Sequence, residues 1–258
     1  MATNQLAIID KFQKEIESEF VQGILAQSLK ENADTFTTSL VEIFSSESSL
    51  QECSPSLIIS EAMKAASLRL PITKGLGQAF IIAYKGKPSF QIGYKGYIQL
   101  AIRSGLYETI NADVVYEGEL TRQDKLKGTF DLNGQKTSDE VIGYFAHIEL
   151  KNGFSKTLYM SKDKVIAHAK KYSKTFNSEY SPWKNDFDQM ALKTVLKAIL
   201  SHYGTLSVEM QSAFNNDIDE EISTNANTEN VTFTEAVVVS TEQPKVEDKP
   251  APKKAPAF

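Results

Sequence analysis

The sequence has few residues of the kinds that build disulfides, zinc clusters or membrane spans. Its 258 residues include one cysteine, Cys53, and three histidines, too few for a disulfide framework or a Cys/His zinc cluster of the usual spacing. No run of about 18 apolar residues occurs. The N-terminal segment has helical spacing with acids instead of the basic and then apolar pattern of a secretion signal. We therefore expect a cytoplasmic protein that does not enter a membrane.

The sequence also lacks the glycine-rich loop of ATP-binding proteins. No G-x-x-x-x-G-K-[ST] pattern occurs, because Gly86 and Lys87 are followed by Pro88, while Gly75 and Gly77 lead into an expected strand rather than a helix. This absence argues against an ATP-driven recombinase or helicase. We therefore expect no required cofactor, ATP included, and leave magnesium possible but unassigned.

Acids are missing from the middle of the chain, although the overall net charge is −5. Residues 1–59 hold 3 bases and 9 acids, residues 60–205 hold 21 bases and 14 acids, and residues 206–258 hold 4 bases and 10 acids. No acid occurs between Glu61 and Glu108. A basic middle segment between acidic ends is typical of a protein that binds the phosphates of a nucleic acid.

The acid-free region contains a stretch that combines cations, aromatic rings and glycines, KGLGQAFIIAYKGKPSFQIGYKGYIQLAIRSG at residues 74–105. Residues 78–84 and 88–92 have the composition of two strands. The turn between them contains Lys85, Gly86 and Lys87, with a cation on each side of a glycine. The pattern predicts a hairpin with two lysines at its tip.

A helix is expected to follow at residues 93–104, with Gly105 as its left-handed cap. Lys95, Gln99 and Arg103 fall at i, i+4 and i+8 on one face of this helix. Cations of this kind bind phosphates, and tyrosine rings stack on bases. The stretch therefore predicts a nucleic-acid surface, with candidate contacts at Lys74, Lys85, Lys87, Tyr94, Lys95, Tyr97, Gln99 and Arg103.

The remaining pattern alternates helical and extended segments. It is helical over residues 1–45 (one or two amphipathic helices), 55–68, 162–172 and 182–203, and extended over residues 109–117 and 141–160. The second extended segment is expected to be a hairpin that turns at Asn152 and Gly153. These elements predict an α+β fold, in which a small antiparallel sheet and hairpins pack against helices.

The chain is expected to divide at two changes of composition. Residues 1–50 are predicted to form a helical oligomerisation element, and residues 51–205 are predicted to form an α+β core that binds nucleic acid. Residues 206–258 are acidic and rich in proline, so they bury too little apolar surface to offset the entropy of ordering and are expected to form a flexible tail. Phe233 and residues 237–239 of this tail are predicted to dock a partner protein.

Two other functions stay open on the residues alone. Asp139, Glu149 and Lys151 follow the D…E-x-K order of magnesium-dependent nucleases, in which two carboxylates hold the metal and the lysine steadies the developing charge. The simpler interpretation of these three residues is a solvated strand face and loop. A passive single-strand-binding protein is the other alternative.

Two separated blocks, GLGQAFIIAYKGKPSFQIGYKGYIQLAIRSG and SPWKNDFDQMALKTVLKAIL, occur in an order that resembles the RecT family of phage and prophage single-strand annealing proteins. The similarity covers about residues 40 to 203. Matching motif residues are Gly75, Gly77, Gln78, Gly93, Tyr94, Lys95, Gly96, Arg103, Trp183, Met190, Ala191, Lys193 and Thr194.

The resemblance implies an ATP-independent protein that coats single-stranded DNA, pairs it with a complementary strand and holds the new duplex in a ring or helical filament. It also implies a phage exonuclease as partner, and we add a single-strand-binding protein as a second candidate. A basic groove along the DNA backbone is expected in such a protein. Further cations expected to line it are Arg122, Lys125, Lys127, Lys170, Lys171, Lys174, Lys193 and Lys197.

Overall fold

The computed structural model describes residues 2–173, 176–179, 181–205, 207 and 210–214, with side chains from Leu6 onward. All of these residues belong to one compact unit. Most of the tail predicted at residues 206–258, including everything from residue 215 onward, lies outside the described residues, as does Lys174. Among the described helices, none is both long and apolar enough to cross a membrane.

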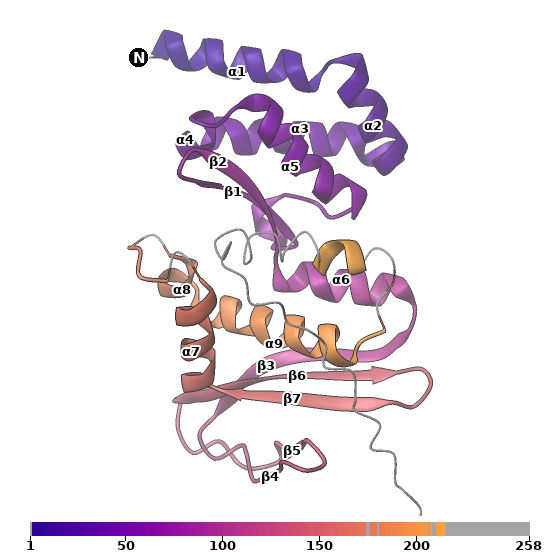
Figure 1. The fold of residues 1–258 in the computed structure, drawn as a ribbon, viewed down its shortest axis with the longest axis vertical. Coiled ribbons are helices and arrows are strands. Elements are labelled where there is room, and N and C mark those ends of the chain that lie inside the picture. Colours follow the sequence, from indigo (N-terminus) through magenta and orange to yellow (C-terminus); the bar gives the residue numbers. More distant parts are fainter. Residues whose placement is uncertain (1, 174–175, 180, 206, 208–209, 215–258) are drawn as a thin grey trace, which may run out of the picture. The chain divides into compact units, whose positions relative to one another are not determined.

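The elements confirm the expected α+β class (Figure 1). The helices are α1 (Ala2–Ile16), α2 (Glu19–Leu29), α3 (Ala33–Ser46), α4 (Ser48–Gln51), α5 (Pro55–Ser67), α6 (Tyr94–Ser104), α7 (Lys162–Tyr172), α8 (Pro182–Asn185) and α9 (Phe187–Tyr203), with short 3-10 turns at Lys30–Asn32 and Lys74–Leu76. The strands are β1 (Ala79–Tyr84), β2 (Lys87–Ile92), β3 (Tyr107–Tyr116), β4 (Arg122–Asp124), β5 (Thr129–Asp131), β6 (Val141–Leu150) and β7 (Ser155–Ser161).

The N-terminal segment forms three main helices rather than the one or two predicted. The chain turns after α1, and α2 ends at Lys30, whose φ is 53°. Phe12 of α1 and Phe44 of α3 are fully buried, and their rings stack with centroids 4.0 Å apart. Both α1 and α2 also pack on α5, so these helices share one hydrophobic core with the rest of the described chain.

Helix α5 supports the hairpin of β1 and β2. It begins with Pro55 after Ser54, as predicted, and buries Ile58 and Ala62. Leu57 lies on the opposite face of the helix and is 50% exposed. The hairpin packs against α5, where the Phe90 amide donates a hydrogen bond to Glu61 Oε2 at 2.9 Å.

Beyond the β1–β2 hairpin, the chain forms a three-stranded antiparallel sheet in the order β3-β6-β7. Tyr144, Ala146 and Ile148 of β6 are fully buried, as the alternating pattern predicts. Helix α9 packs against all three strands and against α6, and α7 packs on β6 and β7 (Figure 1). The turn between β6 and β7 contains Gly153 with φ of 86°, as expected.

The predicted last helix is divided into α8 and α9. Ser181 caps α8, because its hydroxyl accepts the Trp183 amide at 3.3 Å, and the helix then breaks at Asp186, with φ −138° and ψ 54°. Trp183 is 7% exposed and lies in the core. Residues 210–214 are helical and bury Phe214, so the folded chain continues past the predicted boundary at residue 205.

Candidate nucleic-acid interface

The tip of the β1–β2 hairpin carries two exposed lysines. Lys85 and Gly86 form a two-residue turn with φ of 50° and 75°, the left-handed pair of a type I′ turn, and Lys87 pairs with Tyr84. A left-handed lysine costs about 1–2 kcal/mol. Neither lysine forms an ion pair with a residue that the structure describes. Lys85 therefore occupies a backbone conformation that is unfavourable for lysine, and its charged side chain is exposed at the tip.

A positive φ recurs at two other cations. Among the described residues other than glycine, those with a positive φ are Lys30, Arg69 and Lys85. Glycine, or asparagine in the left-handed region, would relieve the backbone at such positions. Strained residues of this kind cluster at functional positions, so the three cations are candidates for a role outside the chain's own packing.

Lys95 projects from the first turn of α6 beside the loop that precedes β1. Its Cδ lies 3.5 Å from where a Cβ of Gly77 would be, and Gly77 has a φ of 63°. The Gly93 amide donates to the Gln78 carbonyl at 2.9 Å, and a Cβ on Gly96 would lie 2.2 Å from that same oxygen. Gly93 and Gly96 thus let α6 press against the loop, which fixes the position of Lys95.

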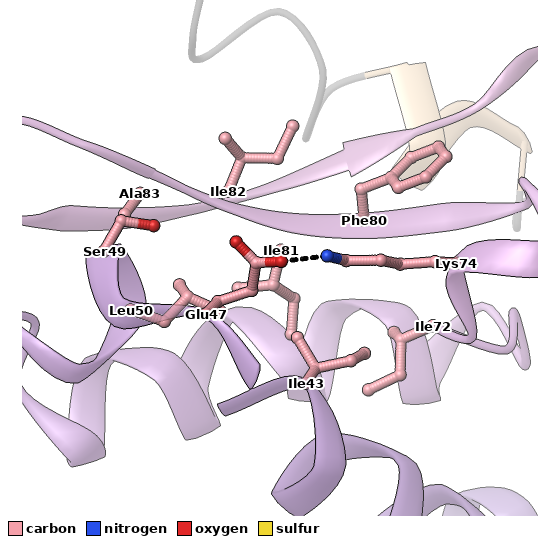
Figure 2. Close-up of a pocket in the computed structure, with 10 residues that line it drawn as sticks. All are labelled: Ile43, Glu47, Ser49, Leu50, Ile72, Lys74, Phe80, Ile81, Ile82 and Ala83. Atoms are coloured by element: carbon pink, nitrogen blue, oxygen red, sulfur yellow. Dashed lines mark hydrogen bonds and ion pairs between the residues drawn. The ribbon is translucent and has the colours of Figure 1, made fainter. Parts of the chain in front are cut away.

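Two of the cations predicted within residues 74–105 have partners on other elements of the chain. Lys74 pairs with Glu47 across a hollow of about 270 Å³ beside β1 (Figure 2). The Arg103 guanidinium donates to the carbonyls of Leu68 at 2.5 Å and Arg69 at 3.2 Å. Carbonyls at the end of a helix lack partners within the helix, so Arg103 serves as a cap that ties α6 to the end of α5.

The two predicted tyrosines differ in burial. Tyr94 is half-exposed, with Lys95 Nζ 6.0 Å from its ring centroid. Tyr97 is fully buried, and its ring stacks on Phe214 at 5.3 Å. In this arrangement Tyr97 is a core residue that no base can reach, whereas Tyr94 remains accessible. Gln99 is half-exposed on the same helix.

The outer face of β1 is a surface that the sequence reasoning missed. Phe80, Ile82 and Tyr84 alternate with the inward residues Ile81 and Ala83, and all three are half-buried. Figure 2 shows Phe80 and Ile82 on the side of the strand opposite Ile81. The two-residue alternation of this strand was the signal that could have identified the face. The outer face of β1 extends from the base of the hairpin to its tip, a length of about 17 Å at ~3.4 Å per residue.

The remaining candidate cations lie on other elements. Arg122, Lys125 and Lys127 belong to the β4–β5 hairpin, which packs on β7. Lys170 and Lys171 are exposed at the end of α7. Lys193 and Lys197 are half-buried on α9 and take part in further interactions. The structure thus brings Lys85, Lys87 and Lys95 onto the β1–β2–α6 segment and leaves the others on β4–β5, α7 and α9.

The nuclease arrangement is not formed. Asp139 pairs with Lys136 at 2.6 Å before β6 begins, whereas Glu149 lies near the other end of β6. About 27 Å of strand separates them at ~3.4 Å per residue, so these two carboxylates cannot share a metal ion. Within the described part of the chain, no group of three His, Cys, Asp or Glu residues is placed to hold one.

A comparison with protein-family models matches residues 34–232, well over half of the chain, to the RecT family. The chain belongs to the RecT family. This confirms the resemblance carried by the two sequence blocks, both of which lie inside the matched range. RecT-family membership makes the chain a DNA recombination protein of the single-strand annealing class.

Two curated relatives agree with this assignment to the RecT family. The uncharacterized protein YqaK of Bacillus subtilis (strain 168) is 47% identical over 230 residues, which cover 83% of this chain and 79% of the relative. Protein RecT of Escherichia coli (strain K12) is 29% identical over 188 residues, which cover 67% of this chain and 66% of the relative, just under two thirds of its length.

Proposed function

We propose that this RecT-family chain binds single-stranded DNA and anneals it to a complementary strand without ATP, as a ring or filament of identical copies. The observation that carries the proposal is Lys85, held in a left-handed conformation at an exposed hairpin tip with Lys87 beside it. Complementary strands repel through their phosphates, so a protein that anneals them has to neutralise both backbones. Lysines do this without reading base sequence.

The proposed DNA path runs from the tip of the β1–β2 hairpin to Lys95 at the start of α6. Strand β1, which runs between the base of the hairpin and its tip, spans about 17 Å, the length of about five phosphates at ~3.4 Å per nucleotide of a duplex strand. With three contacts at Lys85, Lys87 and Lys95, log affinity for a single strand should fall with a slope of about −2 against log salt, at ~0.7 per contact.

The outer face of β1 is proposed to lie against the bases. Phe80, Ile82 and Tyr84 offer apolar surface between the two groups of cations. Stacking of a base on an aromatic ring contributes about 1–3 kcal/mol and does not depend on base identity. Because this contact uses the face of a base, its pairing edge stays free for the second strand.

The test compares annealing of complementary oligonucleotides, without nucleotide triphosphates, by two triple variants of equal charge. Lys85→Asn with Lys87→Gln and Lys95→Gln should lose binding and annealing together. The control carries Lys162→Gln, Lys164→Gln and Lys184→Gln at three exposed lysines outside the proposed path and should retain both. Equal behaviour of the two folded variants would overturn the proposed path.

The same assay separates the two alternatives. A passive single-strand-binding protein would bind the oligonucleotides but would not make annealing faster than it is without protein. A nuclease would shorten labelled DNA when magnesium is added, and Glu149→Ala would abolish this cleavage. The proposal requires accelerated annealing with the DNA left intact.

The exonuclease and single-strand-binding partners are proposed to bind the tail through Phe233 and residues 237–239, which lie outside the described residues. Truncation after residue 224 tests this without removing Phe214, which packs on Tyr97. Pull-down of the partner should be lost while annealing by the truncated chain is kept. Unchanged pull-down would exclude the tail as the docking segment.

A further inference from the structure

The outer face of α2 carries an exposed aromatic side chain. Phe20 is 77% exposed, and Gly23 and Ile24 follow it one turn later on the same face. Glycine inside a helix destabilises the helix relative to alanine. A Cβ at Gly23 would meet nothing within 4 Å, so there is room for a larger residue at this position. The packing of the chain itself therefore does not require a glycine here. A smooth helix surface beside Phe20 instead suits the close approach of another molecule. We call Phe20, Gly23 and Ile24 the Phe20 patch.

A hollow of about 330 Å³ lies between α3 and the segment that leads from α5 to β1. Its floor is apolar and includes the buried residues Phe36, Leu70 and Ile72. At its edge, Leu76 is 47% exposed, and Arg69 supplies a cation. This acceptor hollow thus combines an apolar floor with a basic rim.

Arg69 stands where a helix normally has glycine. The Arg69 and Leu70 amides donate to the carbonyls of Ala66 and Ala65 at 2.9 and 3.0 Å, the hydrogen bonds of a Schellman motif, and Arg69 has the left-handed φ of 52° that favours glycine there. The chain keeps a strained arginine at the hollow although glycine would cap the helix better. Strain of this kind is retained where the side chain has a use.

The charges of the two surfaces are complementary. Glu17 and Glu19 flank the Phe20 patch and are exposed, while Arg69 is exposed at the acceptor hollow. None of these three forms an ion pair with another described residue. A second copy of this chain therefore presents an acidic, aromatic projection that matches a basic, apolar hollow.

We propose that Phe20 of one copy inserts into the acceptor hollow of the next copy, with Glu17 and Glu19 facing Arg69. The projection and the hollow are different surfaces, so the contact is head-to-tail, and its repetition closes a ring or extends a filament. The inference rests on the self-association proposed above and names the two surfaces that produce it.

The first experiment measures self-association of the full chain without DNA by sedimentation velocity. Phe20→Ser should raise the dissociation constant by about 30-fold or more, the effect of truncating a central aromatic anchor. Gly23→Gln should also weaken association while favouring the helix, so it guards against a folding defect. Leu126→Ser is the control, because Leu126 is 96% exposed on the β4–β5 hairpin, and should associate normally. Normal association of both the Phe20 and Gly23 variants would overturn the inference.

The second experiment tests direction and charge. Arg69→Glu, or Glu17→Lys together with Glu19→Lys, should each weaken association, and all three changes in one chain should restore it. A mixture of Phe20→Ser and Arg69→Glu chains retains one intact projection and one intact hollow, so it should stop at one-to-one pairs. Absence of both restoration and pairing would exclude this contact. A wild-type chain that stays monomeric with and without DNA would instead overturn the proposed self-association itself.

Discussion

Replacing Lys85 by asparagine should make the protein more stable and weaken its binding to DNA. The left-handed lysine costs about 1–2 kcal/mol, whereas asparagine before Gly86 forms the dipeptide that type I′ turns prefer. We expect a gain of about 1 kcal/mol, equivalent to a rise in Tm of about 2–4 °C for a folded unit of this size. Stability and binding therefore change in opposite senses, which a general folding defect cannot mimic.

The loss of binding follows from one phosphate contact. Removing it should make the salt slope shallower by about 0.7 and lower affinity about fivefold near 0.1 M salt. Fluorescence anisotropy of a labelled single strand, titrated between about 50 and 200 mM salt, measures both quantities. Lys30→Gly relieves another positive φ, at 53°, and should raise Tm without changing the slope. An unchanged slope for Lys85→Asn would show that the tip contacts no phosphate, and a lower Tm would refute the reasoning about strain.

Three further predictions concern stability. Gly96→Ala places a Cβ 2.2 Å from a backbone oxygen and should lower the free energy of unfolding, measured by denaturant titration, by about 1–3 kcal/mol. Gly75→Ala places a Cβ where nothing lies within 4 Å and should leave this free energy nearly unchanged. Burial, and then the hydrogen bond to Asp188, raises the pKa of Tyr144. The contribution of Tyr144 to the free energy of unfolding is therefore present below pH ~10 and lost as pH rises toward the folded pKa. Tyr144→Phe should lower the free energy of unfolding by about 1 kcal/mol at neutral pH, and the stability of this variant should fall less steeply than that of the wild type as pH rises above ~10. Arg103→Met leaves two helix-end carbonyls unsatisfied and should lower stability by about 1–3 kcal/mol; a shallower salt slope in this variant would show that Arg103 also contacts DNA.

Local elements were predictable because their signals lie close together along the chain. The hairpin tip at Lys85 and Gly86, the left-handed cap at Gly105 and the turn at Gly153 were all expected, and all four residues have a positive φ. The alternation of apolar residues along β6 matches its buried face. The break at Asp186 was not predictable, because apolar residues continue through it on nearly every side and periodicity carries no sign of the interruption.

The sequence predicts the candidate site as a region, but it does not show which side chains of that region are exposed and unpaired. A span of sequence without acids predicts a segment that binds polyanions, and this prediction needs no knowledge of packing. Which of its cations are available depends on residues far away in the chain. Arg103 meets carbonyls 34 and 35 positions earlier, and Lys74 meets Glu47, 27 positions earlier.

The sequence by itself therefore determined the fold class, the basic middle segment and the RecT family, because each depends on composition, local period or residue order. Only the tertiary structure decided that Tyr97 is core and that Arg103 caps a helix, while Lys85, Lys87 and Lys95 project from the β1–β2–α6 segment. It also revealed the face of Phe80, Ile82 and Tyr84. The physical reason is that a side chain becomes available for DNA only when long-range packing has left it without a partner or burial of its own.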